Sequence, residues 1–177
     1  MQFSFVDRVL ELRPGVSIKT IKALSLAEEY LADHFPRFPV LPGVLMLQAM
    51  TEAGALLVGA SEEFAHSMIT LKEARNVRFA DFVQPGNVLT VTAEILSMGE
   101  REVQLKTQGS LDGHTAVGGR LILERYNLAD TQPELAATDA YLRQHLRDRL
   151  ALVYRSASEP DHKSDTGASS QPSEGKV

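Results

Sequence analysis

Residues 34–52, HFPRFPVLPGVLMLQAMTE, form the stretch that decides the fold. From Gly43 onward the stretch is almost wholly apolar, which is typical of a helix buried on every side. Gln48, Thr51 and Glu52 interrupt it at positions i, i+3 and i+4, so they share one face. A buried polar group without a partner costs roughly 1 to 3 kcal/mol. This face therefore indicates a hydrogen-bonded network, a water-filled cavity, a subunit interface or an active site. The alternative is a stripe that reaches solvent.

The segment before the helix favours an active site. Pro42 suits the first helical position, where its missing N–H costs nothing. Gly43 leaves its backbone N–H uncovered at the positive end of the helix dipole, where it could stabilise a carbonyl oxygen that becomes negative during a reaction. A lone loop histidine is usually a surface residue, but His34 lies in a segment stiffened by three prolines (Pro36, Pro39 and Pro42). The sequence therefore predicts a base, an oxyanion donor and proton donors at one place.

The composition limits the class of protein. The chain has 177 residues, enough for one domain with a proper core. It contains no cysteine, which excludes disulfides and thiolate metal sites. Its formal net charge of −5 argues against general nucleic-acid binding. No cluster of metal-ligating residues stands out, so neither a metal nor another cofactor is expected.

Nothing in the sequence predicts export or a membrane span. The first residues lack a basic region followed by an apolar run, so no secretory signal is expected. Residues 43–60 form the best candidate for a span, but Glu52 lies within them, and an unpaired carboxylate is costly at bilayer depth. A buried helix of a soluble, cytoplasmic protein is the preferred interpretation.

The chain divides into three regions by composition. Residues 1–128 carry the hydrophobic pattern of a folded domain, and residues 129–155 are predicted to form an amphipathic helix capped by Asp130 or Thr131. This helix is expected to pack one side on the domain or on a partner subunit. Residues 156–177 are rich in Ser, Pro and Gly and are predicted to be disordered.

Within the first region the pattern predicts one central helix and several antiparallel strands. Asp112-Gly113 is a strong hairpin signal. Gly118-Gly119 suggests a bulge or the close approach of another backbone. The order of elements indicates an α+β fold in which an antiparallel sheet wraps around one long buried helix. The strands are expected at residues 17–25, 66–78, 88–97, 101–111 and 114–125.

The chain resembles the β-hydroxyacyl-acyl carrier protein dehydratases of fatty-acid synthesis, which have the hotdog fold. The match runs from FVDRVLELRPG at Phe5, through HFPRFPVLPGVLMLQAM, to RNVRFADFVQPGNVL at Arg75 and the strands near Glu124. The resemblance implies a hotdog sheet around the helix at residues 42–58. It also implies a homodimer joined edge to edge, with sites at the interface, and leaves open a trimer of dimers. The acyl substrate would arrive on the phosphopantetheine of acyl carrier protein, with no other cofactor.

The resemblance also assigns roles to residues around the helix. His34 would act on the substrate, and the Gly43 N–H would bind the thioester carbonyl. Phe35, Pro42 and Val44 would contact the substrate, whose acyl chain would lie along the apolar helix wall in a tunnel between subunits.

Two positions depart from the family pattern. The family carboxylate, supplied by the neighbouring subunit, falls at position 48, where this chain has Gln48. A glutamine amide can orient a hydroxyl but cannot give up a proton. Glu52 lies one turn further along, about 5.4 Å, and is our candidate for the acid. Arg37 replaces the glycine that usually follows HFP, which puts the loop geometry in doubt.

Three arginines have two interpretations each. Arg37 is either an entrance residue that meets phosphopantetheine or an acidic carrier protein, or a solubilising surface residue. Arg75 and Arg78 either help to dock the carrier protein or belong to a solvated strand edge.

The sequence therefore favours a dehydratase that converts 3-hydroxyacyl thioesters to trans-2-enoyl thioesters. One alternative is a catalytically impaired acyl-thioester or carrier-protein binding or assembly subunit, which Gln48 would explain. Another is a hotdog thioesterase in which Glu52 activates water.

Overall fold

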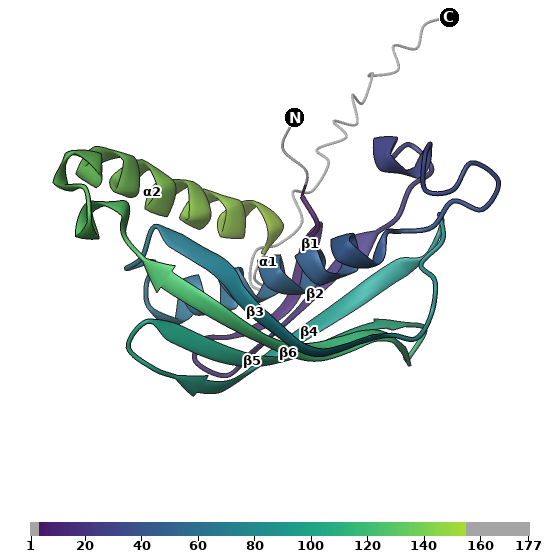
Figure 1. Ribbon diagram of the computed structural model, residues 1–177, viewed down its shortest axis with the longest axis horizontal. Coiled ribbons are helices and arrows are strands. Elements are labelled where there is room, and N and C mark those ends of the chain that lie inside the picture. The colour runs from purple at the N-terminus through teal and green to yellow at the C-terminus, as the bar shows by residue number, and fades with distance from the viewer. Residues whose placement is uncertain (1–3, 155–177) are drawn as a thin grey trace, which may run out of the picture.

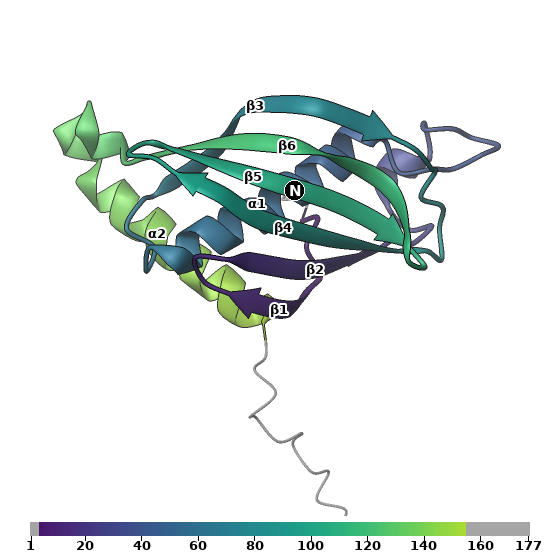
Figure 2. The ribbon, with the colours of Figure 1, turned by 90° about the horizontal axis from the view of Figure 1, so that it is seen from below.

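The structure is a computed structural model that describes residues 4–154. Within that range, six antiparallel strands form one sheet that curves around the long helix α1 (Gly43–Ser61), as Figures 1 and 2 show. This arrangement confirms the α+β hotdog fold. The strands are β1 (Arg8–Arg13), β2 (Ser17–Ala23), β3 (Met68–Phe79), β4 (Val88–Met98), β5 (Glu102–Leu111) and β6 (His114–Tyr126), in the spatial order β1-β2-β4-β5-β6-β3.

The core lies between α1 and the concave face of the sheet. Strands β4 and β5 alternate buried and exposed residues, as strands with one covered face do. The helix crosses the sheet closely at Gly54, where an added Cβ would lie 2.5 Å from a methyl group of Leu105. The residues that α1 buries include Met46, Ala49, Met50, Ala53, Leu56, Leu57 and Val58.

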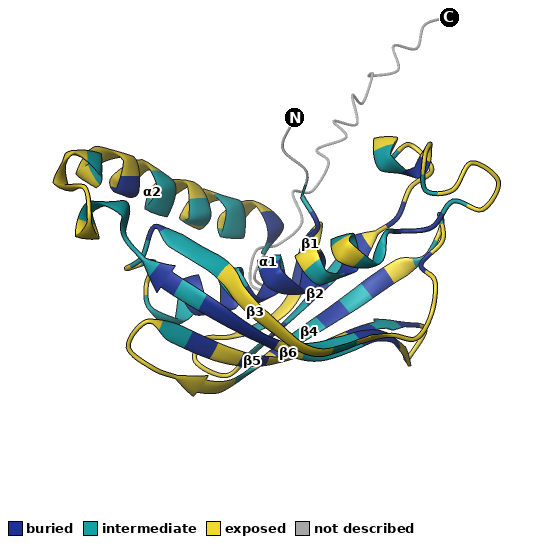
Figure 3. Ribbon diagram, in the orientation of Figure 1, coloured by how far each residue is buried: buried dark blue, intermediate teal, exposed yellow. Residues whose placement is uncertain are grey.

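One side of α1 is open in the single chain, although the sheet buries the rest of the helix. Val44 is 70% exposed and Gln48 is also exposed, whereas the opposite side of the helix is buried (Figure 3). By length and composition alone, α1 could cross a membrane. The sheet wraps it, however, and 56% of its apolar stretch is buried. It is therefore the core helix of the fold.

The predicted glycine features have clear structural causes. Asp112 and Gly113 both have positive φ, 45° and 89°, and connect β5 to β6 in a tight hairpin. An added Cβ at Gly119 would lie 3.1 Å from the Cα of Val77 on β3. Strand β3 bulges at this point, between Arg75 and Arg78. The close approach of another backbone is thus confirmed.

The C-terminal helix begins later than predicted. Helix α2 spans Ala136–Val153, after the 3₁₀ turns η2 (Leu128–Asp130) and η3 (Pro133–Leu135). Asp130 and Asn127 form a capping box around η2, and neither Asp130 nor Thr131 caps α2, so that prediction is wrong. A third 3₁₀ turn, η1, spans Glu29–Leu31. The predicted tail at residues 156–177 lies outside the described residues.

Helix α2 lies beside the domain and is fastened by a buried carboxylate (Figure 1). Asp139 is 1% exposed and accepts the N–H groups of Leu128 and Ala129, each at 2.9 Å, together with the Ser67 hydroxyl. Burial alone would raise the pKa of Asp139. The hydrogen bonds outweigh burial, and the nearby Arg143 adds to them, so the pKa lies below its ordinary value.

Candidate active site

Backbone hydrogen bonds hold the loop that carries His34. The carbonyl of His34 accepts the N–H of Val40 at 3.0 Å. Phe35 and Phe38 exchange two backbone hydrogen bonds, at 3.2 and 3.0 Å. The segment therefore forms a closed turn immediately before α1, and His34 has a fixed position relative to the start of the helix.

One contact determines the tautomer of the half-buried His34 imidazole. Its Nδ1 lies 3.0 Å from the carbonyl oxygen of Val40. A carbonyl oxygen can only accept, so Nδ1 carries the proton and donates it. In the neutral ring, Nε2 then holds the lone pair that a general base needs. The Phe35 ring stacks on the imidazole, with 4.4 Å between centroids, and restricts its orientation.

The first turn of α1 places a bare N–H near this loop. Pro42 is the N-cap rather than the first helical residue, a difference of one position from the prediction. Its carbonyl accepts the N–H groups of Leu45 and Met46. The Gly43 N–H finds no acceptor within residues 4–154 and lies at the positive end of the helix dipole. An added Cβ on Gly43 would lie 3.1 Å from the ring of Phe79, which is exposed and would have to shift slightly to admit it.

The three polar residues of α1 have different surroundings. Thr51 is buried, and its hydroxyl donates to the carbonyl of Leu47 at 2.9 Å, so its own helix satisfies it. Gln48 is exposed, and its Nε2 donates to Oε1 of Glu52 at 3.2 Å. Glu52 is half-buried. The polar face therefore reduces to a Gln48–Glu52 pair.

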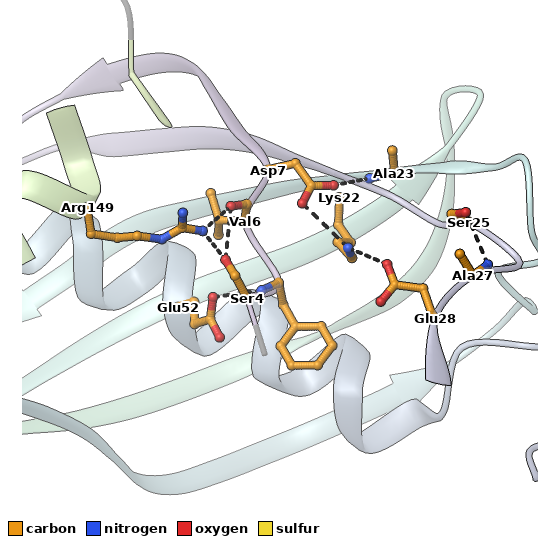
Figure 4. A network of polar contacts seen from close by, with 11 residues as sticks. Ser4, Val6, Asp7, Lys22, Ala23, Ser25, Ala27, Glu28, Glu52 and Arg149 are labelled. Carbon is orange, nitrogen blue, oxygen red and sulfur yellow. Dashed lines mark hydrogen bonds and ion pairs between the residues drawn. The ribbon is translucent and has the colours of Figure 1, made fainter. Parts of the chain in front are cut away.

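Glu52 lies at a junction of three elements. The backbone N–H of Phe5 donates to its Oε2 at 2.9 Å, so the N-terminal segment crosses over this part of α1 (Figure 4). Glu52 also lines a cavity of about 430 Å³ between α1 and α2. It therefore has both a fixed orientation and space beside it.

The N-terminal segment is itself held from two sides (Figure 4). Arg149 of α2 donates to the hydroxyl of Ser4 and to a backbone carbonyl of the same segment. Lys22 is only 6% exposed, and its ammonium lies 2.7 Å from a carboxylate oxygen of Glu28 and 3.4 Å from one of Asp7. Sequence reasoning missed these contacts, because no spacing in the chain links residues 4, 52 and 149.

Exposed aromatic residues surround the start of α1. Phe35, Phe38 and Phe82 are each largely exposed, and the Phe38 and Phe82 rings meet edge to face, with 5.6 Å between centroids. The exposed side chain of Val44 and the ring of Phe79 adjoin the first turn of the helix. An apolar surface of this kind is typical of a binding site or a subunit interface.

Arg37 fits its turn without strain. It is exposed and lies between the paired residues Phe35 and Phe38. Arg37 is not among the non-glycine residues of the described chain that have positive φ, which are Glu63, Phe64, Asn76 and Asp112. The replacement of glycine by arginine therefore requires no left-handed backbone here.

The two arginines of β3 are exposed but differ in their pairing. Both Nε and Nη2 of Arg75 donate to the carboxylate of Glu73, each at 2.7 Å, and this contact lowers the pKa of Glu73. Arg78 has no side-chain hydrogen bond or ion pair within residues 4–154. Of the two, Arg78 has the more available charge.

Two histidines outside the loop pair with carboxylates. His66 contacts Glu62 at 3.2 Å, and Nε2 of His114 lies 2.8 Å from Oδ2 of Asp81. In the part of the chain that the structure describes, no three His, Asp or Glu side chains gather in a way that could hold a metal ion.

Comparison with known proteins places this chain in a family. A family model described as a FabA-like domain matches residues 1–125. The chain belongs to the FabA-like family. The matched residues include the His34 loop, all of α1 and all but the last residue of the sheet, whereas α2 lies beyond them.

Curated relatives of this FabA-like chain include 3-hydroxyacyl-[acyl-carrier-protein] dehydratases. The 3-hydroxyacyl-[acyl-carrier-protein] dehydratase FabZ of Ruminiclostridium cellulolyticum is 34% identical over 119 residues, which cover 67% of this chain and 84% of the relative. The FabZ of Geobacillus thermodenitrificans is 36% identical over 125 residues, which cover 69% and 80%.

Solved structures support the hotdog arrangement of this FabA-like chain. The dehydratase heterocomplex ApeI:P from Xenorhabdus doucetiae matches with a TM-score of 0.62 at 18% identity, covering 75% of this chain and 90% of that one. Zebra fish thioesterase superfamily member 2 matches with a TM-score of 0.51 at 15% identity, covering 66% and 78%. At such identities, these likenesses establish the fold alone.

Proposed function

We propose that this chain is a 3-hydroxyacyl-acyl carrier protein dehydratase of fatty-acid or related lipid synthesis. Relatives named as 3-hydroxyacyl-[acyl-carrier-protein] dehydratases, at 34 to 36% identity over about two thirds of the chain, support this function. The reaction removes water from a 3-hydroxyacyl thioester and leaves the trans-2-enoyl thioester. The enzyme is a carbon–oxygen lyase.

The observation that carries the proposal is the contact between His34 and Val40. Because Nδ1 donates to the Val40 carbonyl, Nε2 is the free basic nitrogen beside the start of α1. Nε2 takes the proton from the α-carbon of the substrate. The Gly43 N–H donates to the thioester carbonyl, whose oxygen gains negative charge as that proton leaves. The two groups act on the α-carbon and on the oxygen of the neighbouring carbonyl group.

The second proton transfer is assigned to Glu52. As the α-proton moves to Nε2, the electron pair of the α-carbon forms the new double bond and the β-carbon–oxygen bond breaks. Glu52 delivers a proton to the leaving hydroxyl, which departs as water. The Phe5 N–H holds Oε2 and the Gln48 amide contacts Oε1. Gln48 therefore orients the acid rather than replacing it.

The same proposal includes a cytoplasmic homodimer with sites at its interface. Strand β3 is an edge of the sheet, and an unpaired edge strand offers backbone groups to a second chain. The exposed aromatic residues near α1 give a second reason to expect a covering partner. The substrate is proposed to arrive on the phosphopantetheine of acyl carrier protein, and the exposed cations Arg37 and Arg78 are proposed to help dock that acidic partner.

A non-catalytic binding subunit is the second candidate. Its support is Gln48, which stands where the resemblance places the family carboxylate, and which is exposed in this chain. General acid assistance is worth about 10²- to 10⁴-fold, so a protein that has lost its acid would keep binding while losing most of its turnover.

One assay separates these functions. The protein is incubated with 3-hydroxyacyl and enoyl thioesters of acyl carrier protein, and water loss, water addition and thioester cleavage are followed. We expect reversible dehydration that falls by about 10²- to 10⁴-fold in Glu52→Gln and His34→Ala. The matched change Gln48→Ala is expected to lower the rate less, because this residue only orients Glu52.

Each contrary result has its own meaning. Full activity in Glu52→Gln would remove the acid role from that residue. Activity that appears only in Gln48→Glu would favour the binding subunit. Thioester cleavage without dehydration would identify a thioesterase.

A further inference from the structure

The cavity beside Glu52 has walls from two helices. Its α1 wall is formed by Glu52, Ala55 and Leu56, and its α2 wall includes Leu146, Arg149 and Leu152. At about 430 Å³, it falls within the range of sites that bind small molecules. The region that matches the FabA-like family ends at residue 125, so α2 lies outside the matched domain.

Most of the lining beyond Glu52 is apolar. Ala55 and Leu56 lie on α1, and Leu146 and Leu152 face them from α2. Arg149 directs its guanidinium to the N-terminal segment, where it donates to Ser4 and Val6, so its alkyl stem is left to cover the cavity. Ser4 and His145 complete the lining, so polar groups occupy part of the wall near Glu52 and Arg149, and hydrocarbon covers most of the rest.

The α2 wall is fixed in place by contacts outside the cavity. Asp139 fastens the start of α2 to the turn at residues 128–129 and to Ser67. Arg147 donates to the carbonyl of Glu63 at 3.0 Å, and Val153 is buried at the end of the helix. The wall is therefore part of the fold.

We infer that this cavity binds the part of the acyl chain beyond the β-carbon, so that α2 sets the chain-length preference. The inference rests on the proposed function, because it takes Glu52 as the group that meets the β-hydroxyl. When the β-hydroxyl of the substrate contacts Glu52, the β-carbon lies at one side of the cavity. The remaining methylene groups of the substrate then continue between Ala55 and Leu56 on one side and Leu146 and Leu152 on the other. The ligand is thus a saturated acyl chain.

The test measures binding rather than turnover. The probes are acyl-pantetheine amides with short, medium and long saturated chains, and affinity is measured by titration calorimetry. Each buried methylene group is expected to strengthen binding about fourfold until the cavity is full. Ala55→Phe fills the cavity from α1, so we expect roughly tenfold or greater loss of affinity for long chains and little change for short ones. Ala151→Phe, at an exposed position outside the lining, is the matched control and should behave as the wild type.

A second variant tests the α2 wall directly. Leu152 is 71% exposed, so Leu152→Asp should leave folding intact while placing a carboxylate beside the hydrocarbon. It should weaken long-chain binding, whereas Ala151→Asp should not. If the acyl chain binds only in a tunnel between subunits, Leu152→Asp and Ala151→Asp will bind long-chain probes with equal affinity. That result would overturn the inference.

The dehydration assay, run in parallel, distinguishes failure of the cavity assignment from failure of the proposed function. Wild-type dehydration combined with equal binding by Ala55→Phe and Ala151→Phe would refute the acyl cavity alone. The expected binding pattern without any dehydration would leave the cavity assignment standing and refute the proposed function. Affinity independent of chain length in the wild type would also refute the cavity assignment.

Discussion

Gly54 determines how closely α1 approaches the sheet. An added Cβ would lie 2.5 Å from a methyl group of Leu105 and 3.2 Å from one of Leu123, and both leucines are fully buried. Overpacking costs about 1–3 kcal/mol, whereas alanine gains only about 1 kcal/mol over glycine in a helix. We expect Gly54→Ala to lower the free energy of unfolding by about 1 kcal/mol, measured by urea denaturation. Gly59→Ala, whose nearest contact would be 3.1 Å from the Phe64 ring, should be closer to neutral. Equal effects of the two changes would contradict this packing argument.

The sequence predicted individual residues well where the backbone alone decides their role. His34 lies in the turn before α1, Gly43 begins the helix and Asp112-Gly113 forms the hairpin turn, because loop and turn geometry is local; the catalytic roles of His34 and Gly43 stay predictions. The polar face of α1 was less predictable. Thr51 bonds to its own helix, whereas Gln48 reaches solvent, and the exposure of Gln48 depends on distant parts of the chain that residue spacing does not reveal.

At the scale of elements, α2 depends on the carboxylate of Asp139. Its pKa is lowered in the folded protein, so its contribution to stability is present above the ordinary carboxylate pKa of 3.8 and is lost as pH falls through the lower folded value. We expect the unfolding temperature of the wild type to drop at acidic pH. In Asp139→Asn it should be lower at neutral pH and change less with acid. Asp148→Asn, on the exposed side of α2, is the control, and an identical acid response in Asp139→Asn and the wild type would contradict the prediction.

The boundaries of α2 show why the sequence located this helix only approximately. The helical spacing of its leucines predicted the element, but Asp130 belongs to the capping box of η2, and Asp139 bonds back to that turn from within α2. A carboxylate that reaches back along the chain leaves no signal in the periodicity. The cavity between α1 and α2 was unpredictable for the same reason, because it arises from contacts between residues that are far apart in sequence.

For the whole molecule, the proposed interface leads to a test by mixing subunits. If His34 of one protomer works with Glu52 of its partner, then His34→Ala and Glu52→Gln each abolish both sites of their own homodimers. A mixed dimer contains one site with both substitutions and one site with neither. Random exchange makes half of the dimers mixed, so the mixture should recover about a quarter of wild-type activity. The measurement is dehydration after co-refolding the two variants, with different affinity tags to confirm that mixed dimers form. If mixed dimers form but stay inactive, each site is built within a single chain, because every protomer then lacks one of the two groups. The partner subunit would then contribute no residue to the site beside the exposed Gln48 and Val44. Pairing of two subunits along the edge strand β3 would have no catalytic role.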